Sequence, residues 1–253
     1  MRRFGFCFML TAVLVGSLAS SATAISLNPT NDAMLYQFPF AGPGTPPMKS
    51  LYPTTLASGF TGTGHDLASV VNFDTASTGL TAAQVSSATL NLFVIPGSTL
   101  PPPALGADAD ATHQIQIDVF KLAVSPAWNE NTVKWSTAPL ASGGAIDSAA
   151  IAGVGQWISL DVTSLVVDWL TTPANNNGLL LSQPGPRVNN GAGSATVALF
   201  DSTDGGANEL YLEITEAEAV PEPSTLAMGG VAAVACVLCA GWQRHRRNVA
   251  RRT

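Results

Sequence analysis

Five aspartates in three short acidic groups are the residues of this sequence best suited to bind a hard cation. They are Asp32, the pair Asp108 and Asp110, and the pair Asp201 and Asp204. Calcium prefers carboxylate and amide oxygens as ligands, but none of these groups has the spacing of an EF-hand loop. The pattern allows calcium as a cofactor that fixes loops, and it equally allows solvated acidic loops.

The acidic residues near position 200 also raise the question of catalysis. A glycosidase needs two carboxylates about 5–10 Å apart across a cleft. Asp201, Asp204 and Glu209 are candidates, but their Gly, Asn and Ser neighbours indicate an acidic turn. The sequence has no Gly-x-Ser-x-Gly or His-Glu-x-x-His motif, and His65 and His113 are too few for a usual zinc site. We therefore expect no catalytic residues and no enzyme activity.

Trp128 and Trp135 are the candidate glycan-binding residues. Indole rings can stack on sugar rings, but aromatic side chains more often serve as core and loop anchors. Both roles stay open for these two residues and for Trp157 and Trp169. We interpret Glu130 as a hydrogen-bond acceptor that locks a turn rather than as an acid catalyst.

The N-terminal segment has the organisation of a secretory signal peptide. Two arginines follow the initiating methionine, an apolar run comes next, and residues 22–24 read Ala-Thr-Ala, a small-x-small cleavage site. We predict a signal peptide over residues 1–24, with cleavage between Ala24 and Ile25.

The C-terminal segment combines a proline motif, an apolar run and a basic tail. Residues 217–224 form a linker that contains Pro221, Glu222 and Pro223. Residues 225–242 carry no charge, and as a helix they would span roughly 27 Å, close to the thickness of the hydrocarbon core. We predict a transmembrane helix over 225–242, with the arginine-rich residues 243–253 on the cytoplasmic side. A plain single-pass anchor is one interpretation of this tail.

Charge and cysteine usage describe the part between these two ends. From residue 25 to 220 there are four bases and sixteen acids, a formal charge near −12. Such a surface repels nucleic acid and anionic membranes, so we expect no nucleic-acid partner. Cys7, Cys236 and Cys239 all lie in the terminal segments, so the exported part needs no disulfide and has no thiolate metal site.

Residues 25–216 predict one all-β domain. Six short runs, most of them alternating and all bounded by turn residues, lie at 67–73, 88–94, 114–120, 179–181, 195–200 and 210–215. A period of two at this spacing predicts two packed antiparallel sheets.

One segment has helical spacing instead. Its apolar residues are Val162, Leu165, Val166, Trp169 and Leu170. This stripe predicts a short helix that closes one mouth of the sandwich and buries Trp169. Asp161 or Thr163 can cap its start.

Four motifs in this domain resemble the DNRLRE-type domains of secreted bacterial proteins. Residues 85–92 are similar to their "v-x-x-A-x-L-x-L" strand, and residues 128–135 match Trp-x-Glu-x-Thr-Val-x-Trp. Residues 157–169 match "W-x-x-x-D-V-T-x-x-V-x-x-W", and residues 176–179 match Asn-x-Gly-Leu. The resemblance implies a jelly-roll β-sandwich with relatives among carbohydrate-binding modules, for which alginate-like polysaccharide is the known ligand class.

The last 33 residues resemble the PEP-CTERM sorting signal. Pro-Glu-Pro, an apolar helix and an arginine cluster follow one another in that order. The resemblance implies that an exosortase, a membrane-embedded transpeptidase, removes the helix after it has anchored the protein in the inner membrane. It also implies delivery to the cell surface or extracellular matrix of a Gram-negative-type bacterium.

Two functional hypotheses follow. The first is a non-catalytic surface module that binds or organises exopolysaccharide. The second is a structural adhesion or matrix protein without a defined glycan ligand. Exposed coplanar aromatic rings on one sheet face would favour the first hypothesis. A charge near −12 disfavours polyanionic alginate as ligand unless calcium bridges the two.

Overall fold

The computed structural model describes residues 22–36, 47, 54–60, 66–96, 107–108, 114–183, 196–204 and 208–218. Ala22–Ala217 form one compact unit. The sorting motif, the predicted transmembrane helix, the basic tail, Asp110 and all but the last three residues of the predicted signal peptide lie outside the described residues. Within those ranges, no helix has both the length and the hydropathy needed to cross a membrane.

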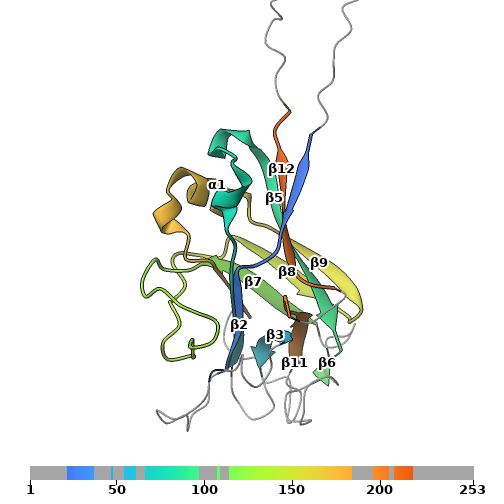
Figure 1. Ribbon diagram of the computed structural model, residues 1–253. Coiled ribbons are helices and arrows are strands. Elements are labelled where there is room, and N and C mark those ends of the chain that lie inside the picture. The colour runs from blue at the N-terminus through green and yellow to red at the C-terminus, as the bar shows by residue number, and fades with distance from the viewer. Residues whose placement is uncertain are drawn as a thin grey trace, which may run out of the picture. The chain divides into compact units, whose positions relative to one another are not determined.

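The described residues are mainly β-strands with one α-helix (Figure 1). The strands are β1 (Ala24–Leu27), β2 (Asn31–Tyr36), β3 (Thr55–Phe60), β4 (Asp66–Asn72), β5 (Val85–Ile95), β6 (Ala107–Asp108), β7 (Ile115–Lys121), β8 (Asp147–Ile151), β9 (Gln156–Asp161), β10 (Leu179–Ser182), β11 (Thr196–Asp201) and β12 (Tyr211–Glu216). The helix is α1 (Thr163–Thr171), and the short 3-10 turns are η2 (Thr75–Thr78), η3 (Ala82–Gln84) and η6 (Pro173–Asn175).

The strands form an antiparallel β-sandwich, as predicted. In one layer β5 is central, with β9 on one side and β12 on the other, and β1 pairs with β12. In the other layer β8, β7, β10 and β4 follow one another, and β4 also pairs with β2 and β3. β11 joins the layers because it pairs with both β3 and the end of β5. Among the described strands, only β6 and β11 pair in parallel.

Alternation in the sequence decides which side chains fill the space between the layers. The inward positions of β5, Leu90, Leu92 and Val94, are fully buried, and so are Leu212 and Ile214 of β12. Each such side chain stabilises the fold by about 1.5–3 kcal/mol relative to exposure. All six predicted runs correspond to strands, namely β4, β5, β7, β10, β11 and β12. β1, β2, β3, β6, β8 and β9 were not predicted as strands.

The predicted helix is α1, and its apolar stripe is buried. Leu165, Val166 and Trp169 have exposed fractions of 2 %, 0 % and 1 %. The capping prediction was wrong in detail, because Val162 occupies the N-cap position and makes no side-chain cap.

Asp161 and Thr163 instead join the start of α1 to β5. The Asp161 carboxylate accepts hydrogen bonds from the Thr163 N–H at 2.9 Å and from its hydroxyl at 2.6 Å. These bonds stabilise the carboxylate and lower the pKa of Asp161. The Thr163 hydroxyl in turn accepts a hydrogen bond from the backbone N–H of Ala88 at 2.8 Å.

Residues 175–178, which we call the asparagine turn, connect η6 to β10. Their three side-chain amides each donate to a different part of the domain: Asn175 to the Asp168 carboxylate at 3.0 Å, Asn176 to the Phe73 carbonyl at 2.8 Å, and Asn177 to the carbonyls of Ala123 and of Pro126, the latter at 3.1 Å. Asp168 also forms an ion pair with Lys121 of β7, and the lysine hydrogen bond lowers the pKa of Asp168. The asparagine turn thereby ties α1, the end of β4 and the loop after β7 together.

Gly178 is the residue of this turn whose lack of a side chain is required. Its φ is +92°, and a Cβ there would lie 2.3 Å from the carbonyl oxygen of Val71. No real Cβ contact is that short, and the obstacle is backbone of β4, which cannot rotate away. A larger residue would therefore push β10 off β4.

We predict that Gly178→Ala lowers the free energy of unfolding by about 3–5 kcal/mol, because left-handed backbone strain adds to the clash with β4. Gly155→Ala is the matched control, since Gly155 has φ +72° but nothing within 4 Å of its would-be Cβ. The control should cost only about 1–2 kcal/mol. Urea unfolding of both variants measures the difference, and equal losses would contradict the role of the close approach.

Candidate functional site

Three aromatic side chains lie side by side on the outer face of the β9–β5–β12 layer. We call Trp157 of β9, Phe93 of β5 and Tyr211 of β12 the aromatic strip. The Trp157 ring centroid lies 5.3 Å from that of Phe93 and 5.4 Å from that of Tyr211, with interplanar angles of 63° and 68°. Trp157 is 43 % exposed. The two other rings are half-buried and support the indole edge-to-face.

The same face becomes polar next to the strip. Asn91 of β5 lies opposite Tyr211 on one side and Ser159 of β9 on the other. The Ser159 hydroxyl donates to the Asn91 side-chain oxygen at 2.7 Å, and the Asn91 amide donates to the Thr89 carbonyl at 3.3 Å. Glu213 of β12 lies opposite Thr89 and adds a carboxylate. We call Thr89, Asn91, Ser159 and Glu213 the polar row.

The strip and the polar row together offer the two kinds of contact that a sugar needs. The exposed indole can stack on the C–H face of a sugar ring, and the Ser159 hydroxyl and the Glu213 carboxylate beside it can hydrogen-bond to ring hydroxyls. Asn91 is 7 % exposed and orients the Ser159 hydroxyl from below. Because both sets of groups belong to paired strands, their spacing is fixed by the sheet register. This arrangement can bind a ligand without prior ordering, which reduces the entropic cost of association.

Sequence reasoning named only one member of the strip. Trp157 stood among the four tryptophans with an open role, whereas Phe93 and Tyr211 were missed. Both lie at outward positions of strands that alternation predicts, between the buried residues Leu92, Val94 and Leu212. The pattern could therefore have placed them on the outer faces of their strands, but not on neighbouring strands.

In the structure, the Trp128 side chain helps to hold the fold together. Its indole N–H donates to the carbonyl of Asn177 in the asparagine turn at 2.8 Å. Its ring packs against a core cluster that includes Leu122 and Val133. Glycan binding by Trp128 stays a prediction, since these contacts leave the ring half-buried.

Trp135 and Glu130 lie in the same segment as Trp128. Trp135 is 37 % exposed and is the second large aromatic side chain at the described surface. The Glu130 carboxylate accepts a hydrogen bond from the backbone N–H of Asp32 at 3.3 Å, so it contacts β2. A role of Trp135 in binding a glycan also stays a prediction.

Two of the three acidic groups meet in the structure. The Asp32 side chain is fully buried, and its carboxylate accepts hydrogen bonds from the N–H and hydroxyl of Thr203 at 2.9 and 3.0 Å. This places Asp32 against the turn that holds Asp201 and Asp204. Burial raises the pKa of Asp201. Asp108 lies in β6, and Asp110 is outside the described residues.

No cluster of three or more His, Cys, Asp or Glu side chains suited to a metal is found in the described part of the chain. Asp32 contacts the 201–204 turn by hydrogen bonds to Thr203, and not as part of a carboxylate cluster. Calcium binding at Asp32, Asp201 and Asp204 stays a prediction.

The described residues thus form a two-layered β-domain with an exposed tryptophan and hydrogen-bonding side chains on one outer face. Comparison with protein families identifies the module: the chain belongs to carbohydrate-binding module family 96, whose model matches residues 54–216. This agrees with the carbohydrate-binding relatives that the DNRLRE-type resemblance implied. Members of such families are typically non-catalytic.

A second family model, the PEP-CTERM protein-sorting motif, matches residues 219–247. This match confirms the predicted sorting motif. It implies processing by an exosortase and an extracellular or cell-surface location, reached through the membrane. No curated protein matches the chain.

We predict that calcium raises the melting temperature of residues 25–220 by several degrees, because a cation bound by Asp201 and Asp204 would stabilise the folded form of their turn. Thermal unfolding with calcium and with chelator measures the effect. An Asp201→Asn, Asp204→Asn double variant, which leaves the buried Asp32–Thr203 bonds in place, should lose the shift. Identical thermal unfolding curves of the parent protein in calcium and in chelator would contradict calcium binding.

Proposed function

We propose that this protein is a non-catalytic, exported module that binds exopolysaccharide through the aromatic strip and the polar row. The observation that carries the proposal is the exposed Trp157 ring, held edge-to-face by Phe93 and Tyr211 beside hydrogen-bonding groups on the same sheet face. Membership of a carbohydrate-binding family supports it.

The charge of the domain favours a neutral glycan. The exported part has only four bases, and one of them, Lys121, is paired with Asp168. Glu213 adds a negative charge to the polar row itself. A uronic acid polymer would meet repulsion from the whole domain, whereas a neutral chain would not. The ligand class we assign is therefore a neutral polysaccharide.

Export proceeds through the two terminal signals. A signal peptidase cleaves between Ala24 and Ile25, and the apolar run 225–242 anchors the protein transiently in the inner membrane of a Gram-negative-type bacterium. Exosortase then recognises Pro221, Glu222 and Pro223 and releases the module to the surface or extracellular matrix. The sorting-motif match supports this sequence of events.

A structural adhesion or matrix protein without a glycan ligand is the second candidate. The observation in its favour is the tilt of the rings, 63° and 68°, which departs from the coplanar arrangement of an extended stacking platform. Two of the three rings then serve mainly to pack against Trp157. In that case the strip would stabilise the sheet and bind nothing.

We predict that Trp157→Ala weakens binding of a neutral bacterial exopolysaccharide by about tenfold or more, because one sugar–indole stack is lost. Isothermal titration of the full chain, in a detergent without a sugar headgroup, measures the affinity. Trp135→Ala is the matched control, since this ring has a similar exposed fraction on a different element.

The control separates the proposed site from the other exposed tryptophan. Unchanged affinity in Trp157→Ala together with a loss in Trp135→Ala would move the site to the 128–135 segment. Absence of binding to every neutral and uronic acid polymer tested would favour the structural candidate.

We also predict that replacing Pro221, Glu222 and Pro223 by alanine traps the protein in the membrane fraction. Exosortase would no longer recognise the tail, so the basic residues 243–253 would stay attached. Immunoblots of cell fractions from a bacterium with an exosortase measure the location and mass. Glu218→Ala, which removes a carboxylate from the adjacent linker, is the control and should leave release unchanged. Normal release of the motif variant would contradict exosortase processing at this motif.

A further inference from the structure

The outward residues of β9 form a line from Trp157 through Ser159 to Asp161. All three side chains are exposed. Their neighbours on the central strand are less so: Phe93, opposite Trp157, and Thr89, opposite Asp161, are half-buried. A ligand that approaches this outer face therefore meets the β9 side chains first.

The Asp161 carboxylate at the end of this line is held in place and keeps one oxygen free. Its Oδ1 accepts both hydrogen bonds from Thr163, and these bonds lower its pKa, so the group is ionised at neutral pH. Within the described part of the chain, no donor bonds to its Oδ2. The backbone N–H of Asp161 is fixed as well, by a 2.7 Å bond to the Asp147 carboxylate. An exposed, ionised oxygen in a fixed position is a strong acceptor for a ligand hydroxyl.

A second carboxylate lies on the other side of Thr89. Thr89 of β5 is opposite Asp161 on β9 and opposite Glu213 on β12. Because neighbouring strands are about 4.8 Å apart, the backbones of the two acids are about 10 Å apart. The small Thr89 side chain lies between them. A sugar positioned over Thr89 would therefore have a carboxylate on either side to accept bonds from its hydroxyls.

The strand register distinguishes two directions for a chain that starts on Trp157. Across the strands, the chain next meets Phe93, which has no hydrogen-bonding group. β12 begins at Tyr211, which lies opposite a residue two positions earlier in β5, so no residue of β12 lies opposite Phe93. Along β9, the chain meets the Ser159 hydroxyl and then the Asp161 carboxylate. Hydrogen-bonding side chains therefore continue along the strands and not across them.

The distance along β9 sets what kind of ligand can use both ends of the line. Trp157 and Asp161 are four residues apart, which is about 13 Å along an extended strand. A single sugar ring is too short to contact both side chains, so the contacts need linked sugars of one chain. We propose that the polysaccharide lies parallel to β9, with one sugar stacked on Trp157 and a later sugar over Thr89, between the two carboxylates. Asp161 is then a binding residue that belongs to neither the aromatic strip nor the polar row. The inference rests on the proposed function for the stacked sugar.

The test measures how affinity depends on the length of the sugar chain. The full chain, labelled with ¹⁵N-tryptophan and held in a detergent without a sugar headgroup, is titrated with glucose and with oligosaccharides of two to six residues from cellulose, curdlan and dextran, three neutral bacterial exopolysaccharides. The Trp157 indole signal, assigned with Trp157→Phe, reports stacking. In at least one series the affinity should rise about tenfold or more from glucose to the longer members, because the later sugars reach the carboxylates.

Two variants test the carboxylates. Asp161→Asn keeps an oxygen for the Thr163 bonds but turns the free acceptor into a donor. Thr89→Lys leaves those bonds untouched and places an ammonium between the two acids, where it pairs with them. Each variant should lower the affinity for the longer oligosaccharides by about fivefold to tenfold and leave that for glucose unchanged. Asp74→Asn is the matched control, because Asp74 is also exposed and its Oδ1 also accepts a backbone N–H bond, at the start of η2.

The outcomes separate this inference from the proposed function. Equal affinity for all lengths of a series that binds would overturn the direction along β9 and leave the stacking on Trp157 intact. A gain with length that persists in both Asp161→Asn and Thr89→Lys would have the same meaning. A Trp157 signal that no oligosaccharide moves would contradict the stacking contact itself, and the proposed function and the inference would fail together.

Discussion

The position of α1 against the β8–β7–β10–β4 layer depends on the asparagine turn. Its three carboxamides donate to α1, to the end of β4 and to the loop after β7, and the Asn177 carbonyl accepts from Trp128. Each bond contributes only about 1 kcal/mol net, but buried groups that lose their partner cost more. Gly178 then lets β10 run directly against β4. One short segment thus fixes the distances between elements that lie far apart in the chain.

Strands with one buried face were predictable, because alternation directly reflects the pleat. β5, β7 and β12 follow this rule. β2 does not, since residues 32–35 are all buried and contact core clusters on both sides of the strand. β8 carries small residues, so its pattern of exposure has little contrast in the sequence. Strands that are buried on both faces, or that are built from Ala and Ser, lack the signal on which the prediction relied.

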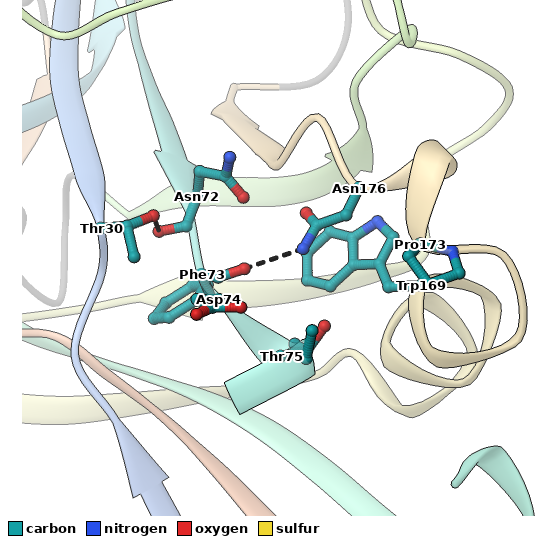
Figure 2. Close-up of a pocket in the computed structure, with 9 residues that line it drawn as sticks. Thr30, Asn72, Phe73, Asp74, Thr75, Trp169, Pro173 and Asn176 are labelled. Atoms are coloured by element: carbon teal, nitrogen blue, oxygen red, sulfur yellow. Dashed lines mark hydrogen bonds between the residues drawn. The ribbon is translucent and has the colours of Figure 1, made fainter. Parts of the chain in front are cut away.

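The four tryptophans of the domain show which part of the site could not be predicted from the sequence. Helical spacing correctly predicted that Trp169 is buried, but residue type left the other three equivalent. The structure separates them: Trp128 anchors a loop, and Trp135 and Trp157 are exposed. Strand register, not composition, brings Phe93 and Tyr211 to Trp157. The half-open pocket lined by Asn72, Trp169 and Asn176 (Figure 2) was equally hidden from the sequence. It depends on Asn176 meeting Phe73 across a long stretch of chain, a contact that no local pattern encodes.

β1 pairs with β12 and with no other described strand, so the first strand of the domain closes on its last. Ile25 to Leu27, which follow the predicted cleavage site, pair with Ile214 to Leu212 in this ladder. A chain that crosses the membrane amino end first delivers β1 long before its partner exists outside. The edge of β1 therefore has no β12 to pair with until translocation is nearly finished. Completion of the ladder therefore coincides with arrival of the whole domain.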